Sequence, residues 1–140
     1  MPLTAIVLAA GEGTRMKSHH PKIVHKLLDK PLVWWSVNAA ITAGADRVIV
    51  VVGNHADEVK SALSCFPNLE YVAQTERLGT GHAVKVVKDA LGGFKGPVVV
   101  INGDASLLRA QSILDLVAET KAHHNACTVL TMTPPDPTGY

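Results

Sequence analysis

Three short runs that are apolar almost throughout constrain the fold of this chain more than any other feature. They are TAIVLAA at 4–10, RVIVVVG at 47–53 and PVVVING at 97–103. Runs that are rich in β-branched residues and lack polar alternation are typical of strands covered on both faces of a parallel sheet. LEYVA at 69–73 and ACTVLTM at 126–132 also read as strands.

The segments between these runs have helical periodicity. Residues 31–43 begin with a proline and end before Gly44, which is the usual asymmetry of a helix. Residues 81–91 and 110–122 each place their apolar side chains on one face. This alternation of strands and helices predicts an α/β fold: a Rossmann-like, open and mainly parallel sheet with helices on both faces.

Composition limits the function classes. The 140 residues carry 13 Lys and Arg against 12 Asp and Glu, a net charge of +1, which argues against a general nucleic-acid or membrane-surface binder. Neither a signal-peptide pattern nor an apolar run long enough for a bilayer is seen, so we expect a cytoplasmic protein. The two cysteines, Cys65 and Cys127, are predicted to be reduced thiols in the packed interior.

A loop at 11–22 combines glycines with cations directly behind the first apolar run. Gly11 and Gly13 would let backbone N–H groups approach phosphate oxygens, and Arg15 and Lys22 would counter their charge. Because ligands of open α/β sheets sit beyond the carboxyl ends of the strands, this loop is a candidate phosphate site. A purely structural turn remains the alternative.

Two common phosphate motifs are excluded for this loop. GEGTRM lacks the third glycine of GxGxxG, since Met16 stands there, and no GxxxxGK[ST] occurs. Asp104 follows the run at 97–103, where a carboxylate could ligate a nucleotide-bound Mg²⁺ or could instead cap the following helix.

Several motifs together resemble one family. They are LAAGEGTRMKSHHPK, AQTERLGTGHA, NGD, GNHADEV and DPTGY, in this order along the chain. The sequence resembles the sugar-1-phosphate nucleotidylyltransferases of the MobA-like superfamily over essentially all 140 residues. Within them it is most similar to the N-terminal uridylyltransferase (pyrophosphorylase) domain of the bifunctional enzymes that also carry a glucosamine-1-phosphate acetyltransferase domain.

This resemblance implies a reaction and a cofactor. UMP would be transferred from UTP to N-acetylglucosamine 1-phosphate, giving UDP-N-acetylglucosamine, a peptidoglycan precursor, and pyrophosphate. Mg²⁺ would be held by Asp104, and Arg15 and Lys22 would be the catalytic cations that counter charge on the triphosphate. The resemblance also implies a set of substrate-binding residues: Leu8, Ala9, Ala10, Gly11, Gly13, Lys22, Gln74, Gly79, Thr80 and Gly139.

Within that set, the resemblance assigns Leu8 to Gly11 to the uracil and ribose, and Gln74 to the uracil edge. Thr80 has a second interpretation, as the N-cap of the helix predicted at 81–91. His55 and His82 match family positions, but we expect local hydrogen-bonding roles for them rather than catalysis.

Two departures from the family pattern matter. Ser106 stands where the family usually has a proline, which we expect to loosen the backbone beside Asp104. The turn-rich segment TPPDPTGY favours a chain that has been cut inside a larger domain. The resemblance implies a second Mg²⁺ ligand, sugar-binding residues and a trimeric β-helix domain beyond Tyr140, so we expect residues 1–140 alone to bind nucleotide weakly and to turn over little.

Two alternatives stay open at this point. One is a nucleotidyltransferase that acts on another sugar phosphate or on molybdenum cofactor. The other is a non-catalytic nucleotide-binding module that retains the fold.

Overall fold

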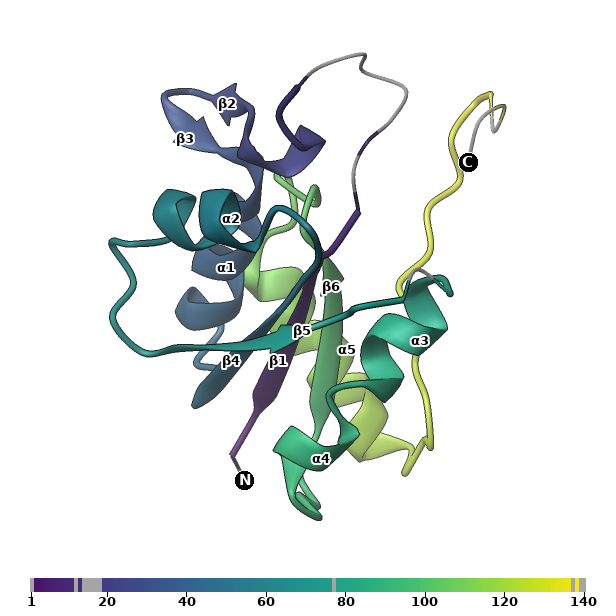
Figure 1. Ribbon diagram of the computed structural model, residues 1–140. Coiled ribbons are helices and arrows are strands. Elements are labelled where there is room, and N and C mark those ends of the chain that lie inside the picture. Colours follow the sequence, from purple (N-terminus) through teal and green to yellow (C-terminus); the bar gives the residue numbers. More distant parts are fainter. Residues whose placement is uncertain (1, 12, 14–18, 77, 137, 139–140) are drawn as a thin grey trace.

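A four-stranded parallel sheet forms the centre of the computed structural model, which describes all residues except 1, 12, 14–18, 77, 137 and 139–140 (Figure 1). The strand order is β5-β4-β1-β6, and every neighbouring pair is parallel. The strands are β1 (Thr4–Ala9), β4 (Arg47–Val52), β5 (Leu69–Ala73) and β6 (Val98–Asn102). The prediction of an open parallel sheet is confirmed. Of the five strands expected from the sequence, four are present, and each begins and ends within one residue of its predicted bounds.

Helices cover both faces of the sheet, as predicted. One face is packed by α1 (Leu32–Thr42), α2 (Ala56–Ala62) and α5 (Ala110–Ala122), and the other by the shorter helices α3 (Thr80–Lys85) and α4 (Lys88–Leu91). A 3₁₀ turn, η2 (Lys22–Val24), and a small hairpin of β2 (Lys26–Leu27) and β3 (Lys30–Pro31) link the loop after β1 to α1. Among the described residues, no helix combines the length and apolar character needed to cross a membrane.

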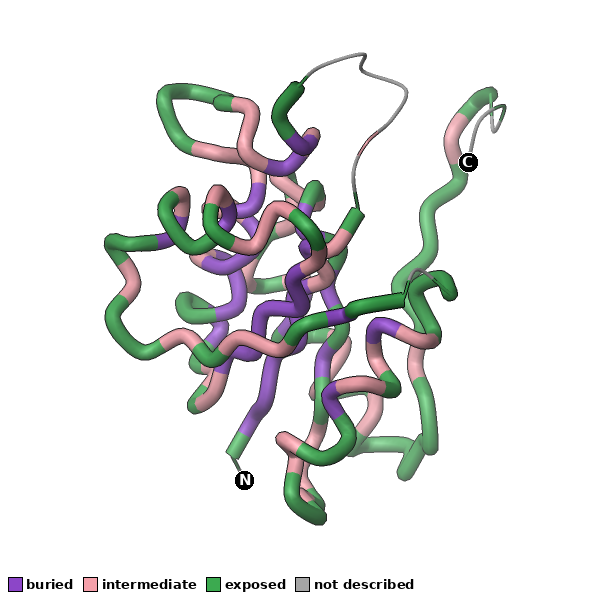
Figure 2. Tube along the Cα trace, viewed as in Figure 1, coloured by how far each residue is buried: buried purple, intermediate pink, exposed green. Residues whose placement is uncertain are grey.

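Two apolar cores flank the sheet, and side-chain alternation along the strands feeds both of them. On β1, Val7 points into the larger core with α1, α2 and α5, while Ile6 points into the smaller core with α3 and α4. Both side chains are fully buried. Figure 2 shows this burial concentrated along the central strands. The almost continuous apolar sequence of β1 therefore follows from cover on both faces.

The strand order reverses beside β1. The chain runs from β1 outward to β4 and β5, and then returns to the opposite side of β1 to form β6. The register pairs Leu8 with Asn102, so the loop after β1 and the turn after β6 leave the same edge of the sheet side by side. Gly103 N–H donates to the Leu8 carbonyl at 2.9 Å, which closes this junction. Such a switch point is where open α/β sheets bind ligands.

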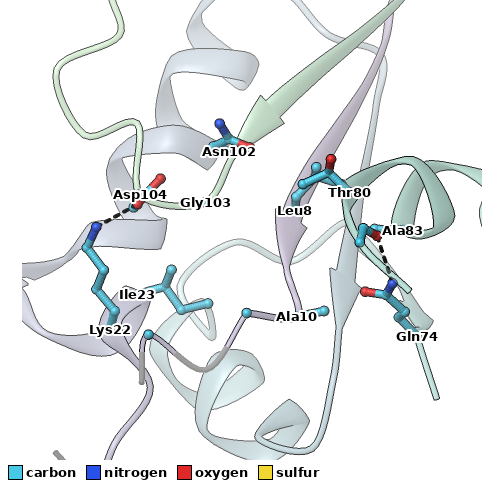
Figure 3. A pocket seen from close by; sticks show the side chains of 13 residues that line it. Leu8, Ala10, Lys22, Ile23, Gln74, Thr80, Ala83, Asn102, Gly103 and Asp104 are labelled. Carbon is cyan, nitrogen blue, oxygen red and sulfur yellow. Dashed lines mark hydrogen bonds and ion pairs between the residues drawn. The ribbon is translucent and has the colours of Figure 1, made fainter. Parts of the chain in front are cut away.

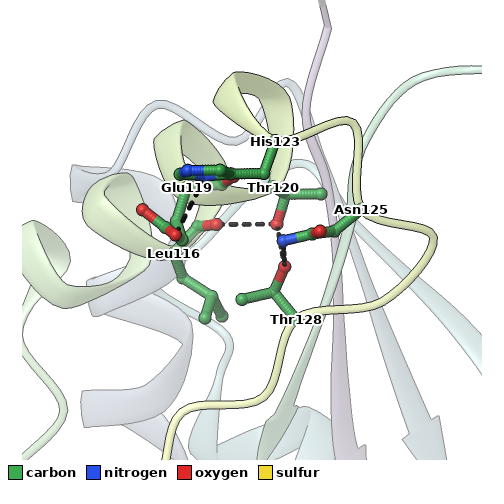
Figure 4. Close-up of polar contacts among 6 residues, drawn as sticks. All are labelled: Leu116, Glu119, Thr120, His123, Asn125 and Thr128. Carbon is green, nitrogen blue, oxygen red and sulfur yellow. Dashed lines mark hydrogen bonds and ion pairs between the residues drawn. The ribbon is translucent and has the colours of Figure 1, made fainter.

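The prediction of a strand at 126–132 is wrong. This segment is extended coil with Val129 73% exposed, and it is connected to α5 by hydrogen bonds among Thr120, Asn125 and Thr128 (Figure 4). An apolar, β-branched sequence makes a strand only when it pairs with the backbone of a neighbour. Within the described chain, β6 pairs with β1 alone, so its other edge carries no strand.

The helix predicted at 81–91 is interrupted. The chain forms α3 and α4, and at the break Val87 N–H bonds to the Val84 carbonyl, an i→i−3 contact in place of the α-helical i→i−4 contact. Thr80 is the first residue of α3 and not its cap; Gly79, with φ of 94°, occupies the cap position. A side chain would be strained at that φ, which explains the glycine.

The prediction of buried cysteines is also wrong, because Cys65 and Cys127 are both exposed free thiols. Cys65 follows α2 in a surface turn, where its Sγ accepts a hydrogen bond from Trp34 Nε1 at 3.2 Å. Cys127 lies in the coil that was expected to be a strand.

Candidate functional site

A pocket of about 690 Å³ opens at the switch point, above the carboxyl ends of β1 and β6 (Figure 3). This volume is typical of sites that hold a nucleotide-sized ligand. Most of the residues expected at the site line it: Leu8, Ala10, Gly11, Gly13, Lys22, Gln74, Gly79, Thr80 and Asp104. The fold therefore gathers four separate sequence segments around one cavity.

An ion pair forms one wall of the pocket. Lys22 Nζ donates to Asp104 Oδ2 at 2.8 Å, although 82 positions separate the two residues in sequence. The two side chains are 45% and 40% exposed, so both charges remain in contact with water and accessible to a ligand. The expectation that the cationic loop and the carboxylate after β6 face one another is confirmed for Lys22 and Asp104.

Backbone geometry places Lys22 at this wall. Gly13 has φ of 60°, and a Cβ on it would collide with the Cβ of Lys22. Glycine at position 13 thus lets the returning chain pack against the outgoing one. Lys22 then begins η2, whose Ile23 is buried in the larger core and anchors the end of the loop.

A carboxylate from α2 holds the chain just before Lys22. Glu58 accepts hydrogen bonds from Nδ1 of His20 at 2.7 Å and from Nδ1 of His55 at 2.9 Å. These contacts, first with His20 and then with His55, lower the pKa of Glu58 below its usual range. The local hydrogen-bonding role expected for His55 is confirmed.

The opposite side of the pocket is largely apolar, and its polar side chains among the described residues are Thr80 and Gln74. Leu8, Ala10 and Ala83 contribute small or aliphatic surfaces, which suits a flat base, and Gln74 adds a side chain that is only 7% exposed. Nε2 of Gln74 donates to the Gly79 carbonyl at 3.2 Å and lies 3.0 Å from Nδ1 of His82. The local hydrogen-bonding role expected for His82 is confirmed as well.

The donor set around Asp104 fits a divalent cation that arrives with phosphates. Among the described residues, no group of three or more His, Cys, Asp or Glu is arranged to hold a metal ion. Mg²⁺, however, commonly takes one or two carboxylates and completes its shell with phosphate oxygens and water. Asp104 is half-exposed, faces the pocket and has Asn102 on the same strand end, so it can supply one such oxygen.

The turn after Asp104 is held by a hydrogen bond that a proline could not make. Ser106 N–H donates to the Asp104 carbonyl at 2.8 Å. A prolyl nitrogen carries no hydrogen, so this contact depends on the departure from the family pattern at position 106. The turn therefore has a contact that the usual proline would lack, and the loosening expected beside Asp104 stays a prediction.

One of the expected site residues faces away from the pocket, and two others cannot be placed relative to it. Ala9 is 3% exposed and its side chain packs into the larger core, because alternation along β1 turns it away from the cavity. Arg15 and Gly139 lie outside the described residues, so their assigned roles stay predictions.

Sequence reasoning missed four residues that line the pocket: Ile23, Ala83, Asn102 and Gly103. Asn102 and Gly103 could have been found from their position beside Asp104 at the strand end. Ile23 carries no such signal.

A larger groove of about 1180 Å³ runs between β6, α5 and the coil at 124–130. Its lining is mostly apolar, and it lies away from the switch point. It offers no paired cation and carboxylate comparable with Lys22 and Asp104. We therefore take the smaller pocket as the functional site.

The pocket's place in the fold agrees with a comparison of the sequence with known families. The MobA-like NTP transferase domain matches residues 5–137. This chain belongs to that family. Bifunctional protein GlmU of Acaryochloris marina is 44% identical over 138 residues, which are 99% of this chain and 30% of the relative. The GlmU of a Picosynechococcus species is 47% identical over 134 residues, or 96% of this chain and 30% of the relative.

The chain thus spans about 30% of the length of these GlmU relatives. A solved structure shares the fold of this MobA-like domain: Rv0371c of Mycobacterium tuberculosis H37Rv in complex with manganese. It has a TM-score of 0.72 at 20% identity, and the match covers 87% of this chain and 61% of that one. An identity this low supports the fold and nothing finer.

Proposed function

We propose that the pocket binds Mg²⁺-UTP and that the protein transfers UMP to N-acetylglucosamine 1-phosphate, forming UDP-N-acetylglucosamine and pyrophosphate. The observation that carries this proposal is the Lys22–Asp104 pair at the switch point, with an apolar base-sized wall and Gln74 opposite. The similarity to GlmU proteins and the membership of a nucleotidyltransferase family support the reaction class.

The proposed chemistry requires positioning and charge neutralisation. An oxygen of the sugar phosphate bonds to the α-phosphorus of UTP, the bond from that phosphorus to the bridging oxygen breaks, and pyrophosphate leaves with the electron pair. Because the attacking phosphate is already an anion, no side chain has to remove a proton. This requirement for charge neutralisation fits a pocket whose charged side chains, among the described residues, are Lys22 and Asp104.

Lys22 is proposed to hold the triphosphate. Its ammonium is half-exposed and already turned into the pocket, so it can move from Asp104 to a phosphate oxygen with little rearrangement. Asp104 and Asn102 would hold the cation, which when bound supplies positive charge against the phosphates. Arg15 is proposed as a second cation on the same loop. The apolar wall of Leu8, Ala10 and Ala83 would exclude water from one face of the base.

Because nucleoside triphosphates are supplied in the cytoplasm, we place the proposed reaction there. A homotrimer formed through a β-helix domain of a longer parent protein remains a proposal from the resemblance to GlmU.

Isothermal titration calorimetry of the chain with UTP, CTP, GTP and ATP in Mg²⁺ tests the binding part of the proposal. We expect UTP to bind most tightly, and Asp104→Ala to weaken it while the exposed α5 variant Asp115→Ala does not. Pyrophosphate release with N-acetylglucosamine 1-phosphate, glucose 1-phosphate or no acceptor tests the transfer. Absence of heat with every nucleotide would refute the proposal.

A further inference from the structure

Glu58 joins two segments that border the pocket. It lies in the first turn of α2, and its two carboxylate oxygens have different partners: Oε2 accepts from Nδ1 of His20 at 2.7 Å, and Oε1 accepts from Nδ1 of His55 at 2.9 Å. His20 belongs to the loop after β1, and His55 to the turn after β4. The carboxylate therefore bridges the segments that leave the carboxyl ends of two neighbouring strands.

The direction of both hydrogen bonds follows from the chemistry of the groups. An ionised carboxylate has acceptor sites only, so each histidine must donate from Nδ1. The bonds to His20 and then to His55 lower the pKa of Glu58, which keeps the group ionised at neutral pH. Hydrogen bonds to a charged acceptor are shorter and stronger than those between neutral groups.

His55 holds the carboxylate in place for its contact with the loop. It is the N-cap residue of α2, three positions before Glu58, and its ring binds one of the two oxygens. The chain reaches His55 from β4 through Gly53, where a Cβ would stand 2.9 Å from the carbonyl oxygen of Ala10, a residue of the pocket. The carboxylate is therefore held from a turn that packs closely against the pocket.

The contact with His20 reaches Lys22 over a single stiff residue. Only Pro21 separates the two, and its ring fixes φ, which is −62° here. A proline also restricts the backbone of the residue before it, which is His20. On the other side of Lys22, the buried Ile23 anchors the chain in the larger core. Lys22 consequently lies between two anchored points, which limits how far its backbone can move from the pocket.

We propose that Glu58 is a positioning residue: by holding His20 against α2, it keeps the backbone of Lys22 where the ammonium can reach the triphosphate. This inference rests on the proposed function, since it needs phosphates opposite Lys22. The loss caused by removing Glu58 should be specific to the phosphates. The wall that would receive the base, Leu8 and Ala10, is held by β1 and does not depend on the contact.

Removing the carboxylate should weaken UTP binding even though it removes a negative charge near the phosphates. In Glu58→Ala the end of the loop must be ordered when UTP binds, so we expect the affinity to fall about 5- to 30-fold. This equals about 1–2 kcal/mol, the conformational entropy of ordering about one residue. Asp57→Ala is the matched control, because Asp57 is exposed in the same turn of α2 and the variant loses the same charge. Charge removal alone would strengthen UTP binding in both variants.

A second pair of variants tests the donor. His20→Leu should reproduce the loss, because leucine offers Glu58 no hydrogen. His20→Asn should restore UTP binding, because its Nδ2 can stand where Nδ1 of the imidazole does and donate to the same oxygen.

The test is a set of dissociation constants in Mg²⁺, measured by calorimetry for UTP and by NMR titration for uridine, which lacks the phosphates. We expect Glu58→Ala to weaken UTP binding and to leave uridine binding unchanged. In a Lys22→Ala background, Glu58→Ala should have no further effect on UTP, because residues that act through one group are not additive. A general loss of structure would instead weaken both ligands and would persist in that background.

Equal UTP affinities of Glu58→Ala and Asp57→Ala, with UTP bound by the wild type, overturn the role of Glu58 and leave the proposed function intact. Equal losses of uridine and UTP affinity in Glu58→Ala overturn it as well. Failure of the wild type to bind UTP overturns the proposed function and this inference together. Long-range ¹H–¹⁵N spectra of the wild type need no variant to fold. They should show a hydrogen on Nδ1 of His20 at neutral pH, and a neutral ring with its hydrogen on Nε2 contradicts the inference.

Discussion

The variant Asp104→Asn separates the proposed phosphate-binding role of Lys22 from the proposed metal-binding role of Asp104. Its effect on UTP affinity should have opposite signs with and without Mg²⁺. Without the metal, the Asp104 carboxylate repels the triphosphate and holds Lys22 at 2.8 Å. The neutral amide removes the repulsion and releases the ammonium. The variant should therefore bind metal-free UTP at least as tightly as the wild type does.

With saturating Mg²⁺ the wild type should bind UTP more tightly than the variant. A unit charge about 4 Å from a cation is worth about 1 kcal/mol in water and about 4 kcal/mol at an effective dielectric constant near 20. Since Asp104 is 40% exposed, we place its contribution between these limits, at about 1–3 kcal/mol. The variant should then bind Mg²⁺-UTP about 5- to 150-fold more weakly than the wild type.

Folding should survive the change. Ion pairs this exposed contribute about 0.2–1 kcal/mol to stability, so the melting temperature should fall by at most about 4 °C. Calorimetric titrations of UTP with Mg²⁺ and with EDTA, on the wild type and the variant, give the four required constants. Asp115→Asn on α5 is the matched control. An equal enhancement of UTP affinity by Mg²⁺ in the variant and the wild type would refute the reasoning.

Two further predictions concern the scaffold of the site. In Gly103→Ala, the new Cβ would stand 2.7 Å from the Leu8 carbonyl oxygen, a backbone atom with little freedom, so we expect a loss of about 1–3 kcal/mol in urea unfolding; an unchanged midpoint would contradict the tight junction. The lowered pKa of Glu58, caused by its bonds to His20 and His55, adds stability at neutral pH that is lost as pH falls below its usual value near 4.5 and through its folded value. In melting curves between pH 7 and 3, the melting temperature of Glu58→Gln should fall less on acidification than that of the wild type. An equal fall in both proteins would contradict the prediction.

The sequence predicts the sheet and both helical layers because burial on two faces leaves a strong pattern. β1 and β4 are apolar runs because they are central and covered on both faces, and α5 is recovered with its bounds. The expectation of cover on both faces is wrong for β6, which lies at the edge of the described sheet with Val98 40% and Val100 45% exposed. The coil at 126–132 has an equally suitable composition, but strand formation depends on a neighbour, and local sequence contains no information on pairing. The break between α3 and α4 is a change of hydrogen-bond spacing at Val87, which periodicity alone does not reveal.

The candidate site likewise has features that the sequence predicts and features that only the fold reveals. Asp104 and the cationic loop could be expected to meet, because both leave carboxyl ends of strands in one parallel sheet. Which cation pairs with Asp104 depends on Gly13 packing against Lys22, a tertiary contact. The contacts of the Gln74 amide with Gly79 and His82 are visible only in the fold. The same holds for the hydrogen bonds of Glu58 with His20 and His55.

The central claim is that nucleotide and metal meet between the loop after β1 and the turn after β6. Paramagnetic broadening in ¹H–¹⁵N spectra of the chain with Mn²⁺ tests it most directly. With UTP present, the backbone signals of Gly11, Gly103 and Asp104 should broaden first, while those of His123 and His124 at the far end of α5 remain sharp. Broadening centred on α5, or equal broadening of Asp104 with and without UTP, would contradict the account.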